Sequence, residues 1–122
     1  MGCSASTDSG STKKKAGAKQ ITLAYFPVRG GPRGMVARYL CNYCNVPYKF
    51  KEYKPMSQEW KDDKAAHELA FFNLPHVIDG NTTITESVAV HQFIALKGRP
   101  EVIGKTPQDK ANRYRMQCIL YE

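Results

Sequence analysis

The sequence predicts an α/β fold in which short strands and helices follow one another in the order β-α-β-α-β-β-α. Two observations predict it. Short runs rich in β-branched and aromatic residues alternate with stretches whose apolar residues recur every three or four positions. The last two strand-like runs are joined by a tight turn at Asp79-Gly80, and a helical stretch follows at once. The 122 residues suffice for one domain with its own core.

The first half of the chain alternates regularly. The elements expected there are a strand at 21–26, a loop at 28–34, a helix at 35–43, a strand at 48–53 and a helix from Ser57 to about Leu69. Pro27, Pro47 and Pro55 end the first strand, the first helix and the second strand, because proline has no N–H to donate. Ser57 is a good N-cap for the second helix.

The second half predicts a hairpin and a helix. The elements expected are a strand at 76–78 after Leu74-Pro75, a strand at 82–84 and a helix at 88–96. A right-handed β-α-β crossover gives parallel strands and the hairpin adds antiparallel ones, which together describe a thioredoxin-like layer. Glu86-Ser87 stands where a strand leads directly into a helix. The free N–H groups, the dipole and the serine hydroxyl then form a small anion site.

The net charge of +7 is unevenly distributed. The first 20 residues hold four lysines and one aspartate, and the remaining positive charges are single and interspersed with acids. That pattern is typical of a solvated surface, and no nucleic-acid recognition motif is present, so no nucleic-acid partner is expected. No apolar run approaches the ~20 residues of a membrane-spanning helix.

Residues 1–19 are rich in Ser, Thr, Gly, Ala and Lys and are expected to be a disordered basic tail. The start, Met-Gly-Cys-Ser-Ala-Ser, fits the N-myristoylation pattern with Gly2 as acceptor, and Cys3 is a candidate for palmitoylation. One acyl chain holds a protein only marginally, but a second chain and the lysines would reinforce it. An unmodified solubilising extension is the alternative.

The four cysteines favour a reducing cytosolic compartment, because no secretory signal pattern accompanies them. Cys41 and Cys44 form a Cys-x-x-Cys, but at the end of the expected helix, whereas a redox pair needs the helix start, where the dipole lowers the thiol pKa. They are therefore expected to be buried and inert. The three histidines, His67, His76 and His91, show no metal-ligand spacing and are expected to be surface or strand residues; no metal is expected.

Thr106-Pro107-Gln108-Asp109 predicts another helix start, with Thr106 as N-cap and Pro107 at the first position. The apolar residues that follow define a face that a single helix cannot bury alone. Residues 99–106 are expected to be a linker.

Several stretches together resemble one family. They are Tyr-Phe-Pro-Val-Arg-Gly at 25–30, Asn-Leu-Pro at 73–75, Asp-Gly at 79–80 and Glu-Ser-Val-Ala-Val at 86–90. In order and spacing they resemble the thioredoxin-like N-terminal domain of cytosolic glutathione transferases of the tyrosine type (pi, mu and sigma). The resemblance covers residues 21–98. It implies that 20–98 is the glutathione-binding domain and that 107–122 is the first helix of an incomplete all-helical second domain.

The resemblance implies that Tyr25 is catalytic. A thiol with a pKa of about 8.5 is mostly protonated at neutral pH, whereas the thiolate is the nucleophile. A phenol O–H that donates a hydrogen bond to the sulfur stabilises the anion and lowers the pKa of the thiol. The alternative for an isolated strand tyrosine is core packing.

The resemblance also implies a set of glutathione-binding residues: Phe26, Trp60, Lys64, Asn73, Leu74, Pro75, Glu86 and Ser87. A cis bond before Pro75 would let the Leu74 backbone pair with the cysteinyl backbone of glutathione like an added strand. Ser87 and Glu86 would hold the γ-glutamyl end, and Trp60 and Lys64 the glycyl carboxylate. Gly31 replaces an arginine of the pi class, which removes one contact.

These observations predict a glutathione transferase that conjugates the thiolate of glutathione, its co-substrate, to small electrophiles, in detoxification and glutathione metabolism. The alternatives are a non-catalytic glutathione-binding module, because most of the helical domain that binds the electrophile is missing, and a small redox protein that uses Cys41 and Cys44. A homodimer is expected if the helical domain is present. The expected location is the cytoplasm, with a tether to the membrane surface if the tail is acylated.

Overall fold

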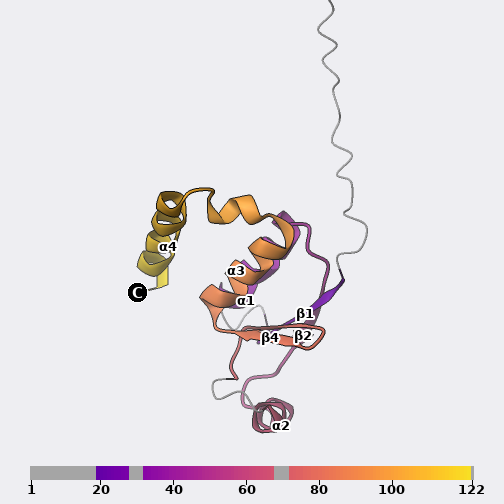
Figure 1. The fold of residues 1–122 in the computed structure, drawn as a ribbon. Coiled ribbons are helices and arrows are strands. Elements are labelled where there is room, and N and C mark those ends of the chain that lie inside the picture. Colours follow the sequence, from indigo (N-terminus) through magenta and orange to yellow (C-terminus); the bar gives the residue numbers. More distant parts are fainter. Residues whose placement is uncertain (1–18, 28–31, 68–71, 122) are drawn as a thin grey trace, which may run out of the picture.

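The computed structural model describes residues 19–27, 32–67 and 72–121, and within them four strands form one mixed sheet (Figure 1). The strands are β1 (Ile21–Tyr25), β2 (Tyr48–Glu52), β3 (His76–Asp79) and β4 (Thr82–Thr85), in the spatial order β2-β1-β3-β4. The β1–β2 pair is parallel, and the β1–β3 and β3–β4 pairs are antiparallel. This is the thioredoxin-like layer that the element order predicts.

Helices lie on both faces of the sheet. Figure 1 shows α1 (Pro32–Tyr43) and α3 (Ser87–Gly98) side by side on one face and α2 (Gln58–Ala66) on the other. Because successive strand residues point to opposite faces, each face of the sheet has its own set of buried side chains. The candidate site residues lie mainly on the α2 face and at one edge of the sheet.

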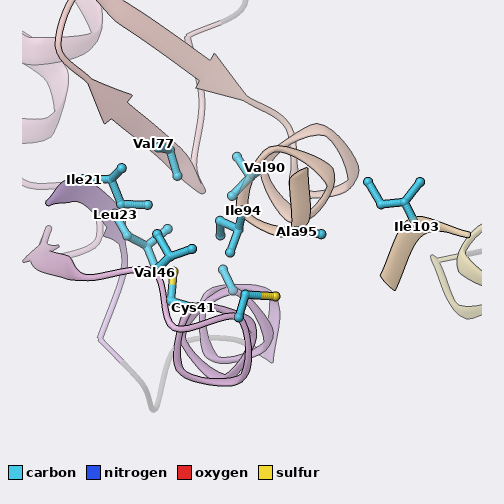
Figure 2. Packing of buried hydrophobic residues seen from close by; sticks show 11 residues of the cluster. Ile21, Leu23, Cys41, Val46, Val77, Val90, Ile94, Ala95 and Ile103 are labelled. Atoms are coloured by element: carbon cyan, nitrogen blue, oxygen red, sulfur yellow. The ribbon is translucent and has the colours of Figure 1, made fainter. Parts of the chain in front are cut away.

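The larger core lies between the sheet and the α1–α3 pair. Figure 2 shows Ile21, Leu23 and Val77 of the sheet turned towards Val90 and Ile94 of α3, and all five are fully buried. Cys41 of α1 joins the same cluster. Burial of a complete aliphatic side chain contributes about 1.5–3 kcal/mol, so this cluster anchors the two helices that start at the edge where the site is expected.

A second, aromatic cluster lies between the sheet and α2. Its buried members are Ala24, Tyr53, Trp60 and Phe72, with Phe26 and Leu74 packed against them. Ser57 caps α2 as expected, because its hydroxyl accepts a hydrogen bond from the Trp60 amide at 3.3 Å. Trp60 is the buried residue of α2, and it therefore fixes this mostly polar helix to the sheet.

Beyond α3 the chain forms a short 3₁₀ helix, η2 (Pro100–Ile103), and then α4 (Pro107–Tyr121). The start of α4 is a capping box: the Asp109 amide donates to the Thr106 hydroxyl at 3.1 Å, and the Thr106 amide donates to the Asp109 carboxylate at 3.2 Å. Figure 1 shows α4 away from the sheet, next to η2. Met116, Ile119 and Leu120 of α4 are exposed.

Some expected boundaries differ from the structure. α1 begins at Pro32 rather than Met35, because proline fits the first helical position, where its missing N–H would have no partner. α2 ends at Ala66 with His67 as C-cap, and Leu69 lies outside the described residues. The linker expected at 99–106 contains η2. His91 is neither a surface nor a strand residue, because it is buried on α3.

Candidate functional site

One edge of the sheet brings together the ends of three strands. Ala24 of β1 and Thr85 of β4 are paired with His76 on the two sides of β3. Because both pairings are antiparallel, one step towards the edge reaches Tyr25, Pro75 and Glu86. Three separate stretches, ending at Tyr25, Pro75 and Glu86, therefore meet at one edge.

Tyr25 ends β1 and is 8% exposed. Its ring lies against Gly34 in the first turns of α1, where a Cβ atom would overlap the Tyr25 side chain. Its carbonyl accepts a hydrogen bond from the Tyr53 amide at 2.9 Å, which continues the β1–β2 pairing past the end of β2. Tyr25 is thus held both by a backbone hydrogen bond and by the packing of its ring.

The segment before β3 has the cis peptide bond that is expected to leave its backbone free to pair with an extended ligand. The Leu74–Pro75 peptide bond is cis, as the sequence predicts. Pro75 is buried, Leu74 is half-buried against the aromatic cluster, and Asn73 is exposed.

The start of α3 lies beside this segment. Glu86 precedes the helix with φ 73° and ψ 129°, and its carbonyl accepts the first helical hydrogen bond, from the Val90 amide at 2.9 Å. The Glu86 side chain is exposed and does not cap the helix, and Ser87 is half-buried. A positive φ is uncommon outside glycine, and here it lets β4 turn directly into α3. The first N–H groups of α3, with the Ser87 hydroxyl, are available to an anion.

A series of rings connects Tyr25 to α2. The Tyr25 and Phe26 ring centroids are 5.7 Å apart, and those of Phe26 and Trp60 are 6.4 Å apart at 80°, an edge-on contact. Lys64 lies one turn beyond Trp60, with its Nζ 5.7 Å from the indole centroid. Trp60 is 9% exposed and Lys64 is exposed. In the structure, Tyr25 thus lies next to Phe26, Phe26 next to Trp60, and Trp60 next to Lys64.

α2 is also fixed by a polar network. Asp63 accepts hydrogen bonds from the Lys51 ammonium at 2.8 Å and from the Tyr53 hydroxyl at 2.6 Å. These two hydrogen bonds hold the pKa of the Asp63 carboxyl below its ordinary value, whereas burial raises the pKa of the Tyr53 phenol. The network ties α2 to Lys51 of β2 and to Tyr53, which follows that strand.

His76 lies in a strand, one of the two places expected for the histidines, but its burial in the core was not predicted. It is 1% exposed in β3, and its ring contacts Trp60, Phe72 and Tyr53. Burial lowers the pKa of His76 to about 4, while a hydrogen bond with the Asn73 backbone acts in the opposite direction. The available signal was positional: His76 directly follows Pro75, and as the first residue of β3 it alternates in direction with the core residue Val77.

The cysteine pair has the inert environment that its place in the helix predicts. Cys41 is fully buried and Cys44 is 2% exposed, and both are free thiols. Burial raises the pKa of Cys41 to about 12 and, in the same direction, that of Cys44. A thiol that does not ionise is a poor nucleophile. This argues against redox chemistry at this pair.

A cavity of about 550 Å³ lies elsewhere, between α1, α3, η2 and α4. Its lining is mostly apolar, including Val36, Leu40, Ile103 and Met116, and it contains none of the predicted glutathione-binding residues. The predicted site is therefore an open edge of the sheet rather than this cavity. Within the described ranges, no group of three His, Cys, Asp or Glu side chains could hold a metal ion. No described helix is long and apolar enough to cross a membrane.

A thioredoxin-like layer with a tyrosine, a cis-proline and a helix start at one edge defines the class of fold. A family model described as the N-terminal domain of glutathione S-transferase matches residues 21–96. The chain belongs to the glutathione S-transferase family.

Curated relatives are similar over the same region. Glutathione S-transferase 2 from Gallus gallus is 32% identical over 96 residues, which cover 74% of this chain and 42% of the relative. Glutathione S-transferase Mu 6 from Mus musculus is 30% identical, with the same coverage. The putative glutathione S-transferase alpha-5 from Dictyostelium discoideum is 34% identical over 98 residues, with 80% and 44% covered. The chain thus spans about two-fifths of the length of these relatives.

Solved structures support the fold. The monomeric glutathione S-transferase Na-GST-3 from Necator americanus has a TM-score of 0.69 at 22% identity, over 84% of this chain and 46% of that one. The glutathione S-transferase from Ascaris lumbricoides has a TM-score of 0.57 at 26% identity, over 76% and 42%.

Proposed function

We propose that the chain binds glutathione at the edge formed by Tyr25, Leu74–Pro75 and Ser87 and acts as the glutathione-binding part of a glutathione transferase. The observation that carries the proposal is the convergence of these three elements. They offer a phenol, an open backbone edge and a helix start, which match the thiol, the peptide backbone and the γ-glutamyl carboxylate of glutathione.

The proposed chemistry needs a thiolate. Tyr25 donates a hydrogen bond to the sulfur, and this favours the anion, whose proton leaves to solvent. A sulfur lone pair then forms a C–S bond with the electrophilic carbon, and the leaving group departs with the electron pair of its own bond. The contacts of Tyr25 with Gly34 and Tyr53 hold the phenol in place before substrate binds.

The remaining residues bind the two ends of the tripeptide. Ser87 and the first N–H groups of α3 hold the γ-glutamyl carboxylate, and the exposed Glu86 faces the ammonium. The Leu74 backbone pairs with the cysteinyl residue, and Phe26 supports Tyr25 and Trp60. Lys64 attracts the glycyl carboxylate, with Trp60 and Asn73 beside it. Glutathione is the co-substrate, and no metal is required.

Calorimetric titration of the chain with glutathione tests the binding. Ser87→Ala is expected to weaken binding roughly tenfold, because a charge-assisted hydrogen bond to a carboxylate is lost. Thr82→Ala removes an exposed hydroxyl at the opposite end of β4 and should leave the affinity unchanged. Equal affinities for Ser87→Ala and the unmodified chain would overturn this placement of the site.

A second candidate function is a glutathione-binding module without catalysis. It is favoured by one observation, that the chain spans only 42% of the length of relatives such as Glutathione S-transferase 2. Turnover with a simple aromatic electrophile distinguishes the two. A transferase should lose about 10²-fold in rate in Tyr25→Phe at saturating glutathione. A binding module would show no glutathione-dependent conjugation above the uncatalysed rate in either form.

The proposed setting is glutathione-dependent detoxification in the cytoplasm, with homodimer formation through the helical second domain in a protein that contains it. Gly2 and Cys3 are proposed acylation sites that would tether the protein to the cytoplasmic face of a membrane. Both sites lie outside the described residues. Mass spectrometry of the amino-terminal peptide from expressing cells, with Gly2→Ala as control, tests the tether.

A further inference from the structure

We propose that Asp63 is a positioning residue for the glycyl end of the glutathione site, because its hydrogen bonds fix α2 against the strand pair that carries Tyr25. The inference rests on the proposed function, since Trp60 and Lys64 of α2 are the residues proposed to bind near the glycyl carboxylate. Asp63 does not contact the ligand in this proposal. It acts through the two residues of α2 that do.

α2 is attached to the rest of the molecule through few side chains. Within Gln58–Ala66, Trp60 is buried and Asp63 is half-buried, whereas the other residues are exposed. Just past the helix, the C-cap His67 stacks on Phe72 with ring centroids 3.8 Å apart. A ring contact lets its partners slide, whereas a hydrogen bond also fixes direction. The hydrogen bonds of Asp63 therefore fix the rotation of α2 in a way that its ring contacts do not.

Asp63 bonds to two residues on one side of the β2 segment. Lys51 and Tyr53 are two positions apart, so their side chains point to the same face of the sheet. The Oδ2 atom of Asp63 accepts hydrogen bonds from Lys51 Nζ at 2.8 Å and from the Tyr53 hydroxyl at 2.6 Å. Glu59 of α2 also approaches Lys51 Nζ, at 3.6 Å, but its side chain is 61% exposed, so this contact contributes little. Asp63 is thus held from two directions at once.

Tyr53 connects these hydrogen bonds to the tyrosine of the site. Its amide donates to the Tyr25 carbonyl at 2.9 Å, and its hydroxyl donates to Asp63. Its ring lies against the Trp60 indole, with centroids 5.1 Å apart. Two hydrogen bonds through one residue thus set the separation of Tyr25 and α2. The cysteinyl and glycyl residues of glutathione are joined by one peptide bond, so the groups that bind them must keep a fixed separation.

By its charge alone, Asp63 would have the opposite effect on binding. Lys64 directly follows Asp63, and its Nζ lies 5.7 Å from the Trp60 ring centroid. A carboxylate next to a site for a carboxylate repels the ligand, so the loss of this charge would by itself tighten glutathione binding. A positioning role predicts weaker binding. The sign of the change therefore separates the two explanations.

Calorimetric titration with glutathione compares Asp63→Ala with Asp62→Ala. Both variants remove one negative charge from adjacent positions of α2, but Asp62 is exposed and accepts its hydrogen bond, at 2.7 Å, from Gln58 of the same helix. Asp63→Ala is expected to bind about fivefold more weakly, the effect of one hydrogen bond. Asp62→Ala should bind as tightly as the unmodified chain or more tightly. Equal affinities in the two variants would overturn the proposal.

The dipeptide γ-glutamylcysteine, which lacks the glycyl residue, separates positioning from a general loss of structure. Asp63→Ala should weaken the binding of glutathione but leave the binding of this dipeptide nearly unchanged, because the dipeptide has no group for α2 to bind. Equal losses for both ligands would indicate that the whole site is disturbed and would reject the glycyl-end role.

A conservative variant tests whether the hydrogen bond itself is responsible. Tyr53→Phe keeps the ring against Trp60 and the backbone bond to Tyr25 but removes the hydroxyl donor. It is expected to weaken glutathione binding about threefold. In combination with Asp63→Ala it should add nothing, because both changes remove the same interaction. Fully additive losses in the double variant would contradict a shared role.

Hydrogen exchange at the α2 amides needs no ligand and separates this inference from the proposed function. Asp63→Ala should raise these exchange rates relative to Asp62→Ala, because the helix loses an attachment to the sheet. Equal rates in the two variants would overturn the proposal even if the unmodified chain binds glutathione. If the unmodified chain binds neither glutathione nor the dipeptide, the proposed function fails and the glycyl-end role fails with it, whatever the exchange rates show.

Discussion

At the scale of single residues, the proposed site depends on one small residue, Gly34, as well as on Tyr25. Gly34 lets the Tyr25 ring approach α1, because a Cβ atom there would overlap the Tyr25 side chain. A motif search centred on Tyr25 does not find Gly34, since the contact exists only after α1 has packed against β1. The stretch of sequence around Tyr25 makes it a candidate site residue, but it does not predict the support that orients its ring.

Cysteine reactivity gives a prediction at this scale. Cys41 and Cys44 should resist alkylation in the native chain, because burial raises the pKa of both thiols, that of Cys41 to about 12. The half-buried Cys118 should react faster. Peptide mass spectrometry after brief maleimide treatment measures this, with treatment in guanidinium as the fully reactive control. Native Cys41 that reacts as fast as Cys118 would contradict the inert assignment and revive the redox alternative.

At the scale of elements, α2 shows what a sequence pattern conveys and what it omits. Ser57 and the polar composition predict the helix and its start, but not how it attaches to the sheet. That attachment uses Trp60 from the helix and Asp63 bonded to Lys51 and Tyr53, groups 10–12 residues apart in the sequence. Similarly, η2 was not predicted, because a four-residue 3₁₀ turn has no periodicity to detect.

The Asp63 network should be measurable as stability. Asp63→Ala is expected to lower the free energy of unfolding by about 1–2 kcal/mol, because the Tyr53 hydroxyl and the Lys51 ammonium lose their shared acceptor. Glu59→Ala is the matched control on the same helix. Its carboxylate lies 3.6 Å from Lys51 and is exposed, so its removal should cost less than about 0.5 kcal/mol. Urea denaturation followed by Trp60 emission compares them, and equal losses in both variants would contradict this account.

At the scale of the whole molecule, the two faces of the sheet have different chemistry. The α1–α3 face is largely aliphatic, whereas the α2 face is aromatic and carries His76. The proposed glutathione residues lie at the edge where the α2 face meets the start of α3, and the exposed apolar residues of α4 lie apart from them. The sequence predicted the layer because periodicity and turns are local. It could not predict the two-face division of the core, which depends on strand register.

This division leads to a prediction for the pH dependence of stability. The pKa of buried His76 is about 4, below its ordinary value of 6.5, and burial lowers the pKa of His91 in the same direction. Between these pH values the unfolded chain binds more protons than the native one, so stability falls as the pH falls from about 6.5 towards 4. The lowered pKa of His76 corresponds to a loss of roughly 3 kcal/mol in the free energy of unfolding across this range. Asp63, whose pKa is lowered, contributes a further loss of stability only below about pH 4.

Urea midpoints measured from pH 7.5 to 4 should therefore decline, and the decline should be shallower in His76→Phe, which has no imidazole to protonate. Parallel curves for the two forms would show that His76 does not titrate as a buried neutral ring in the native state.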